Sequence, residues 1–424
     1  MEKGGRSRAR CGAIFRNVPE IHITFRKTRR IRRKCLNEIL PFFVLTAVFR
    51  KHVAYMSSQP SLSIKTSFRS TALTRVARML FPVSPLLFRG IFATAQDTPY
   101  PGQPLTGPGG AEYVHTSVAF FDAATEADGY WLFEPADPKP DSAEVVVFLH
   151  GYGAYNPMAY GKWIKHLVAK GNIVIYPRYQ KNLMWPRPEA FPENAATGIR
   201  RALAELQKEG RVKPKTDKVA YIGHSYGGVI ASNLGVNWQK FNIPKPVSML
   251  LCEPGSGPFK GARLPGYSGL PADLQMVVVV GEDDYVVGDE FGRLVFQTAT
   301  NTPQRNLVVQ RRSTDGRRWI GATHSEPYSY DLDFDTGLRN YTSKRVLYAA
   351  RLNEVDFNCY WKFADALMES TRNGCYTHVA LGDTPDQRWL GRWSNGKPIR
   401  ELEVVLPEKL ISTGHIPQGM PSGR

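Results

Sequence analysis

A serine flanked by small residues is the first group in the sequence that could act as a nucleophile. Residues 223–228 read Gly-His-Ser-Tyr-Gly-Gly, after an apolar run at residues 218–222 and before a helix-like segment at residues 227–240. In a G-x-S-x-G turn between a strand and a helix, the serine has a strained backbone, and only small residues fit two positions before and after it. Free N–H groups at the helix start would favour negative charge there. Ser225 is therefore the candidate nucleophile; the alternative is a glycine-rich turn with a bystander serine.

A second glycine-rich stretch, His-Gly-Tyr-Gly at residues 150–153, follows the apolar run at residues 144–149. Acyl transfer by a serine requires N–H donors aimed at the oxygen that becomes negatively charged. We expect this oxyanion hole to use the backbone N–H of Tyr226, the residue after the serine, and that of Tyr152. His150 is expected to have a structural role rather than a catalytic one.

Acidic residues follow the apolar run at residues 274–280. An acid at this place can orient a histidine and stabilise the imidazolium that forms during proton transfer. Asp284 is the candidate and Asp283 is the alternative; adjacent positions point in different directions, so only one of them can serve. Glu253, which follows the apolar run at residues 247–252, is a remote third choice or a loop acid that caps a nearby turn.

The general base is expected to be a histidine on a loop after the last strand. His324 lies on the first loop after the apolar run at residues 307–310. His378 is the alternative, but it follows a helical section and is expected to pack or to face solvent. His324 is therefore the candidate base.

These residues follow apolar runs that alternate with helical patterns. Strands are expected at residues 114–121, 130–134, 144–149, 172–176, 218–222, 247–252, 274–280 and 307–310, and helices at residues 158–169, 194–208 and 227–240. The alternation predicts an α/β fold with a mainly parallel central sheet and helices on both faces. In such a sheet, functional groups gather at the carboxyl ends of the strands, where the candidate residues lie.

The order Ser225, Asp284, His324 is the order of the triad in α/β-hydrolases. On this order and on the motifs GHSYGG and LHGYG, the sequence from about residue 113 to residue 330 resembles the α/β-hydrolase superfamily. The motifs are most similar to the branch that contains platelet-activating-factor acetylhydrolases, chlorophyllases, dienelactone-hydrolase-like enzymes and polyester hydrolases. The resemblance implies an α/β-hydrolase fold, a catalytic triad of these three residues, oxyanion N–H donors from Tyr152 and Tyr226, and no cofactor.

The expected function is hydrolysis of a small-molecule carboxylic ester through an acyl-enzyme on Ser225. A serine peptidase or amidase of the same fold is an alternative, and a non-catalytic binding protein on this fold is another. Residues 183–186 could line an apolar pocket or pack as a surface loop. The basic pairs at residues 311–312 and 317–318 could favour acidic substrates or form a solvated face.

Residues 331–424 carry no motif that we can assign. We expect them to be a C-terminal extension of a single hydrolase domain that begins at residue 112, with a helical section at residues 341–371 and a final strand or lid piece at residues 399–406. Cys359 and Cys375 could form a disulfide in an exported protein or stay as two thiols. No Cys/His spacing fits a zinc site.

Nearly all of the excess positive charge lies at the N-terminus. Residues 1–95 hold 19 Lys or Arg and 3 Asp or Glu, whereas the rest of the chain holds 36 and 35. The near-neutral body gives nucleic-acid binding no electrostatic support. No apolar run in residues 1–95 reaches the roughly 18 residues that span a bilayer.

Residues 1–95 are expected to be a basic targeting or disordered segment. Residues 80–95 have the order of a secretory signal, with basic residues before an apolar stretch and an A-x-A site that would be cleaved after Ala95. The protein is therefore expected to be exported, to the periplasm or outside the cell; an organelle transit peptide and a misplaced start codon are alternatives. Residues 96–111 are rich in Pro and Gly and are expected to be a linker.

Overall fold

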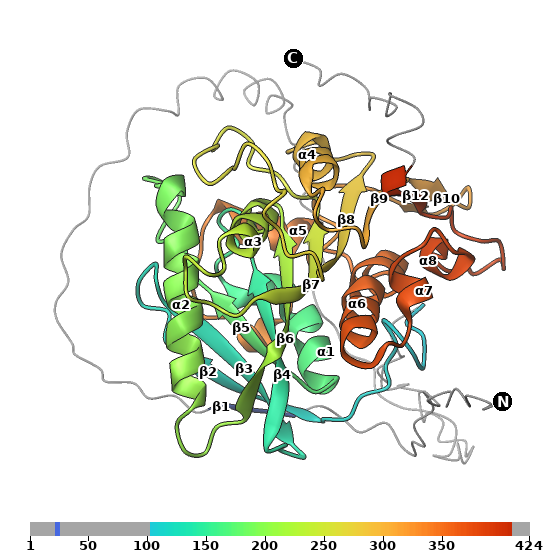
Figure 1. Cartoon of the computed structure of the whole chain (residues 1–424). Helices are drawn as coiled ribbons and strands as arrows, with labels where there is room; N and C mark the ends of the chain where they lie inside the picture. Colours follow the sequence, from blue (N-terminus) through green and yellow to red (C-terminus); the bar gives the residue numbers. More distant parts are fainter. Residues whose placement is uncertain (1–21, 26–101, 409–424) are drawn as a thin grey trace, which may run out of the picture. The chain divides into compact units, whose positions relative to one another are not determined.

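The computed structural model describes residues 22–25 and 102–408 of the chain (Figure 1). The predicted signal at residues 80–95 and its cleavage site at Ala95 lie outside the described residues. In the part of the chain that the structure describes, every helix is too short or too polar to span a bilayer.

One sheet of ten strands forms the centre of the described residues, in the order β1-β2-β3-β5-β4-β6-β7-β8-β9-β12. The six strands from β5 to β9 in this order pair in parallel, whereas β2, β3 and β12 pair antiparallel with their neighbours toward the centre. The strands are β1 (His22–Phe25), β2 (Ser117–Asp122), β3 (Tyr130–Asp137), β4 (Ser142–Leu149), β5 (Asn172–Pro177), β6 (Lys213–His224), β7 (Pro246–Cys252), β8 (Gln275–Gly281), β9 (Arg305–Gln310) and β12 (Glu403–Val405).

Helices cover both faces of this sheet (Figure 1). The core on one face includes side chains of α1 (Gly161–Ala169) and α6 (Lys362–Asn373). The core on the other face includes side chains of α2 (Phe191–Leu206), α3 (Tyr226–Val236) and α4 (Glu290–Thr298). Two of the parallel strands, β5 and β9, are buried from end to end, because side chains on both faces of the sheet meet a helical layer. The predicted parallel sheet with two helical layers, the α/β-hydrolase architecture, is therefore confirmed.

The predicted helical section at residues 341–371 is not one continuous helix. It is divided into α5 (Tyr341–Ala349), a π-helical stretch (Asp356–Trp361) and α6. Ala350 leaves the helix with an extended backbone. A local side-chain bond then starts the next segment, because the Asp356 carboxylate accepts the N–H of Asn353 at 2.8 Å.

The C-terminal residues contribute to the same core as the rest of the described chain. Side chains of α6 pack in the core on the α1 face, and β12 extends the sheet by pairing antiparallel with β9. Residues 102–111 form neither helix nor strand, and Gly109 is buried where its N–H donates to Asp365 of α6 at 2.9 Å. Cys359 is a free, buried thiol, so a disulfide between Cys359 and Cys375 does not form.

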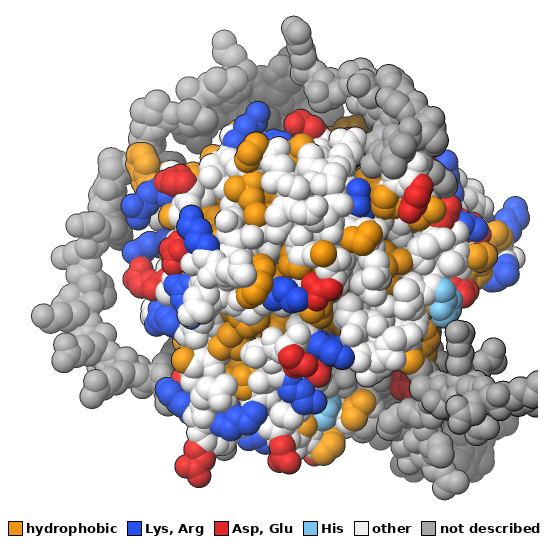
Figure 2. Space-filling view, in the orientation of Figure 1, with side chains coloured by type: hydrophobic (Ala, Val, Ile, Leu, Met, Phe, Trp, Pro, Cys, Tyr) orange, Lys and Arg blue, Asp and Glu red, His pale blue; other side chains and the backbone are white. Residues whose placement is uncertain are grey.

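Charged side chains of both signs lie among one another on the face shown in Figure 2. Many charged side chains of the described residues form ion pairs. Of the basic pairs that could favour acidic substrates, Arg311 lies 2.6 Å from a carboxylate oxygen of Glu403, Arg312 pairs with Asp283, and Arg318 lies 3.6 Å from Asp315. These arginines are thus partnered by the protein's own carboxylates.

Candidate active site

Ser225 lies at the turn between β6 and α3. Its backbone has φ 56° and ψ −123°, a conformation that a residue with a side chain rarely adopts. The turn is possible because the residues two positions before and after Ser225 have no Cβ. A Cβ on Gly223 would lie 2.5 Å from the carbonyl oxygen of Gly227, and one on Gly227 would lie 1.9 Å from that of Leu149. The chain therefore folds as the G-x-S-x-G pattern predicts at this point.

Three predicted residues from separate loops meet at this turn. His324 Nε2 lies 2.8 Å from Ser225 Oγ, and His324 Nδ1 lies 2.8 Å from Asp284 Oδ2. All three are buried, with exposed fractions of 5 to 6 %. The serine hydroxyl, the imidazole and the carboxylate thus form one hydrogen-bonded series, the geometry in which a histidine can take a proton from a serine.

Asp284, and not Asp283, reaches the histidine. The second oxygen of Asp284 accepts the backbone N–H groups of Val286 at 2.9 Å and Val287 at 3.0 Å, which fix the carboxylate. Asp283 instead accepts from the Arg312 guanidinium.

Glu253 and His378 are not part of the hydrogen-bonded series. An oxygen of the Glu253 carboxyl group accepts the Tyr360 hydroxyl at 2.7 Å. His378 is exposed, and its Nε2 lies 3.4 Å from a carboxylate oxygen of Asp386. Neither residue therefore takes the place of Asp284 or His324 in this site.

The loop with Tyr152 faces the serine across the strand ends. The Cβ position of Gly151 is 3.3 Å from Ser225 Cβ. The N–H of Gly151 donates to the Tyr160 hydroxyl at 3.0 Å, and that of Gly153 donates to Gln180 Oε1 at 2.7 Å. Tyr152 is the residue between these two glycines, whose N–H groups both have acceptors within the protein. Tyr226 is the first residue of α3, so its N–H has no acceptor within the helix.

His150 is buried in the protein interior. Its ring stacks on Tyr179 with a centroid distance of 4.1 Å, and Nε2 lies 2.8 Å from the carbonyl oxygen of Arg178. Burial lowers the pKa of His150 to about 4, so the ring is neutral near pH 7. These contacts fit the structural role expected for this residue.

Several residues at the site carried no recognised signal in the sequence. From α5 and the residue before it, Asn340 donates to the carbonyl oxygen of Gly153 at 2.7 Å, Thr342 donates to that of Tyr152 at 3.1 Å, and Arg345 donates to Ser325 Oγ at 3.1 Å. The C-terminal section thereby holds both the loop with Tyr152 and the loop with His324. Its sequence shows only a helical period, which does not say what the helix contacts.

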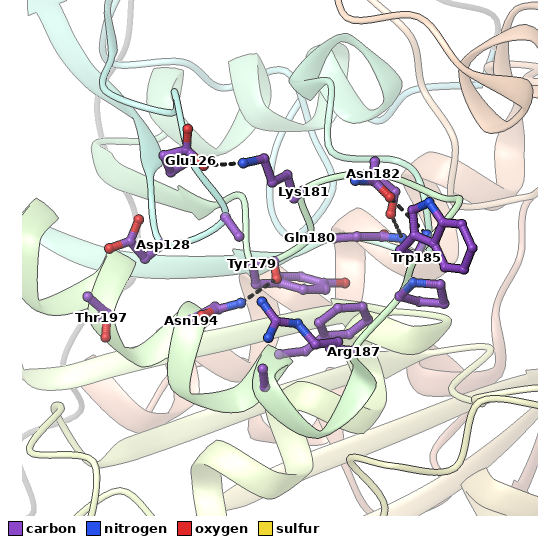
Figure 3. A pocket seen from close by; sticks show the side chains of 14 residues that line it. Glu126, Asp128, Tyr179, Gln180, Lys181, Asn182, Trp185, Arg187, Asn194 and Thr197 are labelled. Carbon is purple, nitrogen blue, oxygen red and sulfur yellow. Dashed lines mark hydrogen bonds and ion pairs between the residues drawn. The ribbon is translucent and has the colours of Figure 1, made fainter.

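A cavity of about 570 Å³ has Gln180 in its wall (Figure 3), and this side chain accepts the N–H of Gly153 from the loop with Tyr152. Tyr179, Trp185 and Phe191 give it aromatic walls, and Gln180 and Asn194 give it amide groups. Ser225 does not line this cavity. Its wall is nonetheless connected to the site, because Phe191 packs against Tyr226 with a ring-centroid distance of 5.5 Å. Trp185, from the loop at residues 183–186, is exposed and lines the cavity.

Glu253 is a buried acid next to the site, and its ionisation gives a stability prediction. Burial raises the pKa of this carboxyl well above its ordinary value, so the folded protein keeps it neutral over a range of pH in which the unfolded chain ionises it. Its contribution to stability is complete below the unfolded-state pKa. That contribution is lost as pH rises toward the folded-state pKa, by up to about 1.4 kcal/mol per pH unit.

Glu253→Gln keeps the shape and removes this pH dependence. We therefore expect the variant to gain stability relative to wild type between pH 5 and pH 8, as measured by urea unfolding at both pH values. If the free energies of unfolding of variant and wild type differ by the same amount at pH 5 and at pH 8, the assignment of a neutral Glu253 is contradicted.

The family model described as Chlorophyllase matches residues 133–280. It represents a family of the α/β-hydrolase superfamily and one of the branches that the motifs resemble, and it indicates a hydrolase. The matched residues include Ser225 and the loop with Tyr152, and they end before Asp284 and His324. No curated protein matches the chain.

Among residues 22–25 and 102–408, no group of three or more His, Cys, Asp and Glu side chains is placed to hold a metal ion.

Proposed function

We propose that the protein is a serine hydrolase that cleaves carboxylic esters through an acyl-enzyme on Ser225. The observation that carries this proposal is the hydrogen-bonded series from Ser225 Oγ through His324 to Asp284, on a turn that holds the serine in a strained conformation. The match to a family of hydrolases supports the same class of reaction.

The mechanism that follows has two steps. His324 Nε2 takes the hydroxyl proton as Ser225 Oγ attacks the ester carbonyl, and the protonated imidazole then gives that proton to the leaving alcohol. Water attacks the acyl-enzyme with the same histidine as base. Asp284 keeps Nδ1 protonated and stabilises the imidazolium. The carbonyl oxygen, negatively charged in the tetrahedral intermediate, accepts the N–H groups of Tyr152 and Tyr226.

Ester and amide substrates with a common acyl group test the substrate class. We expect measurable kcat/KM on p-nitrophenyl acetate and butyrate, and at least about 100-fold lower kcat/KM on the matching anilides, because an amine is a poorer leaving group than a phenolate. Anilide turnover equal to ester turnover would favour a peptidase or amidase of the same fold. Absence of turnover on both, by folded protein, would contradict the proposed function.

Export of the protein remains a proposal that rests on the sequence of residues 80–95. Mass spectrometry of the protein from its native source would test it. An N-terminus at Gln96 is the expected result, and a mature protein that retains residues 80–95 would contradict it.

A further inference from the structure

A buried chain of hydrogen bonds joins the loop with Tyr152 to the loop with His324. The N–H of Gly151 donates to the Tyr160 hydroxyl at 3.0 Å, the Tyr160 hydroxyl lies 2.7 Å from His224 Nδ1, and His224 Nε2 lies 3.0 Å from the backbone carbonyl oxygen of His324. The side chains of Tyr160 and His224 are fully buried. This chain of hydrogen bonds thus includes His224, the residue directly before the nucleophile.

The direction of every bond in this chain is fixed by the groups at its ends. A backbone carbonyl can only accept, so His224 Nε2 carries a hydrogen and donates to His324. Burial lowers the pKa of His224 well below its ordinary value, so the ring is neutral and Nδ1 is an acceptor. The Tyr160 hydroxyl must therefore donate to Nδ1, and its oxygen accepts the N–H of Gly151.

Aromatic packing leaves the His224 ring little freedom to turn away from these partners. The ring of Tyr328 lies edge-on to it with a centroid distance of 5.0 Å, and the ring of His324 lies at 4.9 Å. The Cβ position of Gly151 is 3.3 Å from His224 Nδ1, so the loop also rests directly on the ring. A change in His224 is therefore transmitted to both loops.

We propose that Tyr160 and His224 are positioning residues that set the oxyanion donor of Tyr152 and the base His324 relative to Ser225. Neither side chain is proposed to touch the reacting atoms. The inference rests on the proposed function and extends it. In this proposal His224, the histidine of the Gly-His-Ser motif, holds two loops that come from opposite sides of the nucleophile. The motif alone does not predict this role.

Tyr160→Phe is the test variant, because it removes one oxygen from the centre of the chain and keeps the ring. We expect kcat on p-nitrophenyl butyrate to fall about 10- to 100-fold, the size of effect that small misplacements of catalytic groups produce, with KM within about twofold of wild type. The affinity for a trifluoromethyl ketone, whose adduct carries an oxyanion, should fall by a similar factor. Tyr221→Phe is the matched control, since Tyr221 is equally buried on β6 and its hydroxyl donates to the carbonyl oxygen of Pro244 at 2.8 Å, away from the chain. It should keep the wild-type kcat.

Two replacements of His224 separate the two ends of the chain. His224→Gln places an amide near the position of Nε2 and can still donate to His324, whereas His224→Asn places one near Nδ1 and can still accept from Tyr160. We expect each to retain more activity than His224→Leu, which can do neither. Equal losses in all three variants would indicate a purely structural role and would overturn the inference.

The tautomer of His224 tests the proposed directions of these hydrogen bonds independently of turnover. Nitrogen-15 NMR of histidine-labelled protein at pH 7 should show a neutral His224 with hydrogen on Nε2. Hydrogen on Nδ1, or a protonated ring, would overturn the inference. Wild type that is labelled by a fluorophosphonate, together with Tyr160→Phe that keeps the wild-type kcat, would overturn this inference and leave the proposed function intact. Wild type that is neither labelled nor active would overturn both.

Discussion

Replacement of Ser225 by alanine is expected to lower kcat for ester hydrolysis about 10⁴- to 10⁶-fold, the range found when the nucleophile of a serine triad is removed. The loss is large because no other group in the proposed mechanism can form the acyl-enzyme. KM should change little, since the missing hydroxyl contributes mainly to the transition state. The measurement is steady-state turnover of p-nitrophenyl butyrate by the purified variant.

Ser232→Ala is the matched control for this variant. Ser232 is fully buried on α3, and its hydroxyl donates to the carbonyl oxygen of Gly228 at 2.8 Å. It should keep kcat within about threefold of wild type, because its hydroxyl serves only its own helix. Residual activity of Ser225→Ala above about 1 % of wild type would show that another group is the nucleophile.

Replacement of Asp284 by asparagine is expected to lower kcat about 10⁴-fold. An amide in this position can donate to His324 Nδ1 and so favours the tautomer with hydrogen on Nε2. That tautomer cannot accept the serine proton. Asparagine also removes the negative charge that stabilises the imidazolium. The expected result is a loss in kcat with KM nearly unchanged.

Asp283→Asn is the natural control, because the two aspartates are adjacent and equally buried but have different partners. Asp283 accepts from Arg312, and Asp284 accepts from His324. The control should lose some stability and keep kcat within about fivefold of wild type. A larger loss in kcat for Asp283→Asn than for Asp284→Asn would reverse the assignment of the acid.

Local patterns in the sequence are sufficient to predict the strands β2 to β9 of the central sheet. The β-branched runs at residues 144–149 and 274–280 correspond to β4 and β8, because a strand that is buried on both faces requires apolar side chains at every position. The turn at Ser225 was also predictable, since the steric requirement for Gly223 and Gly227 is local to a few residues. The loops that bring Asp284 and His324 to this turn follow from the parallel order of the strands.

Contacts between distant segments could not be predicted in this way. Tyr160 precedes His224 by 64 residues, and nothing in the sequence around Tyr160 shows that its hydroxyl meets that ring. The contacts of Asn340 and Thr342 with the loop at residues 152–153 likewise join segments almost 190 residues apart. The sequence does not predict the break after Ala349, because the residues that follow continue a helical period, while the turn depends on the side chains of Asn353 and Asp356.

The most direct test of the proposed function is to locate the covalent adduct of a fluorophosphonate probe. Such a probe reacts with a serine only where a base activates the hydroxyl and an oxyanion hole receives the phosphonyl oxygen. The proposal predicts a single adduct on the peptide that contains Ser225, with no labelling of Ser225→Ala and full labelling of Ser232→Ala. A folded wild-type protein without an adduct, or an adduct on another serine, would contradict the proposal that Ser225 is the nucleophile of a serine hydrolase.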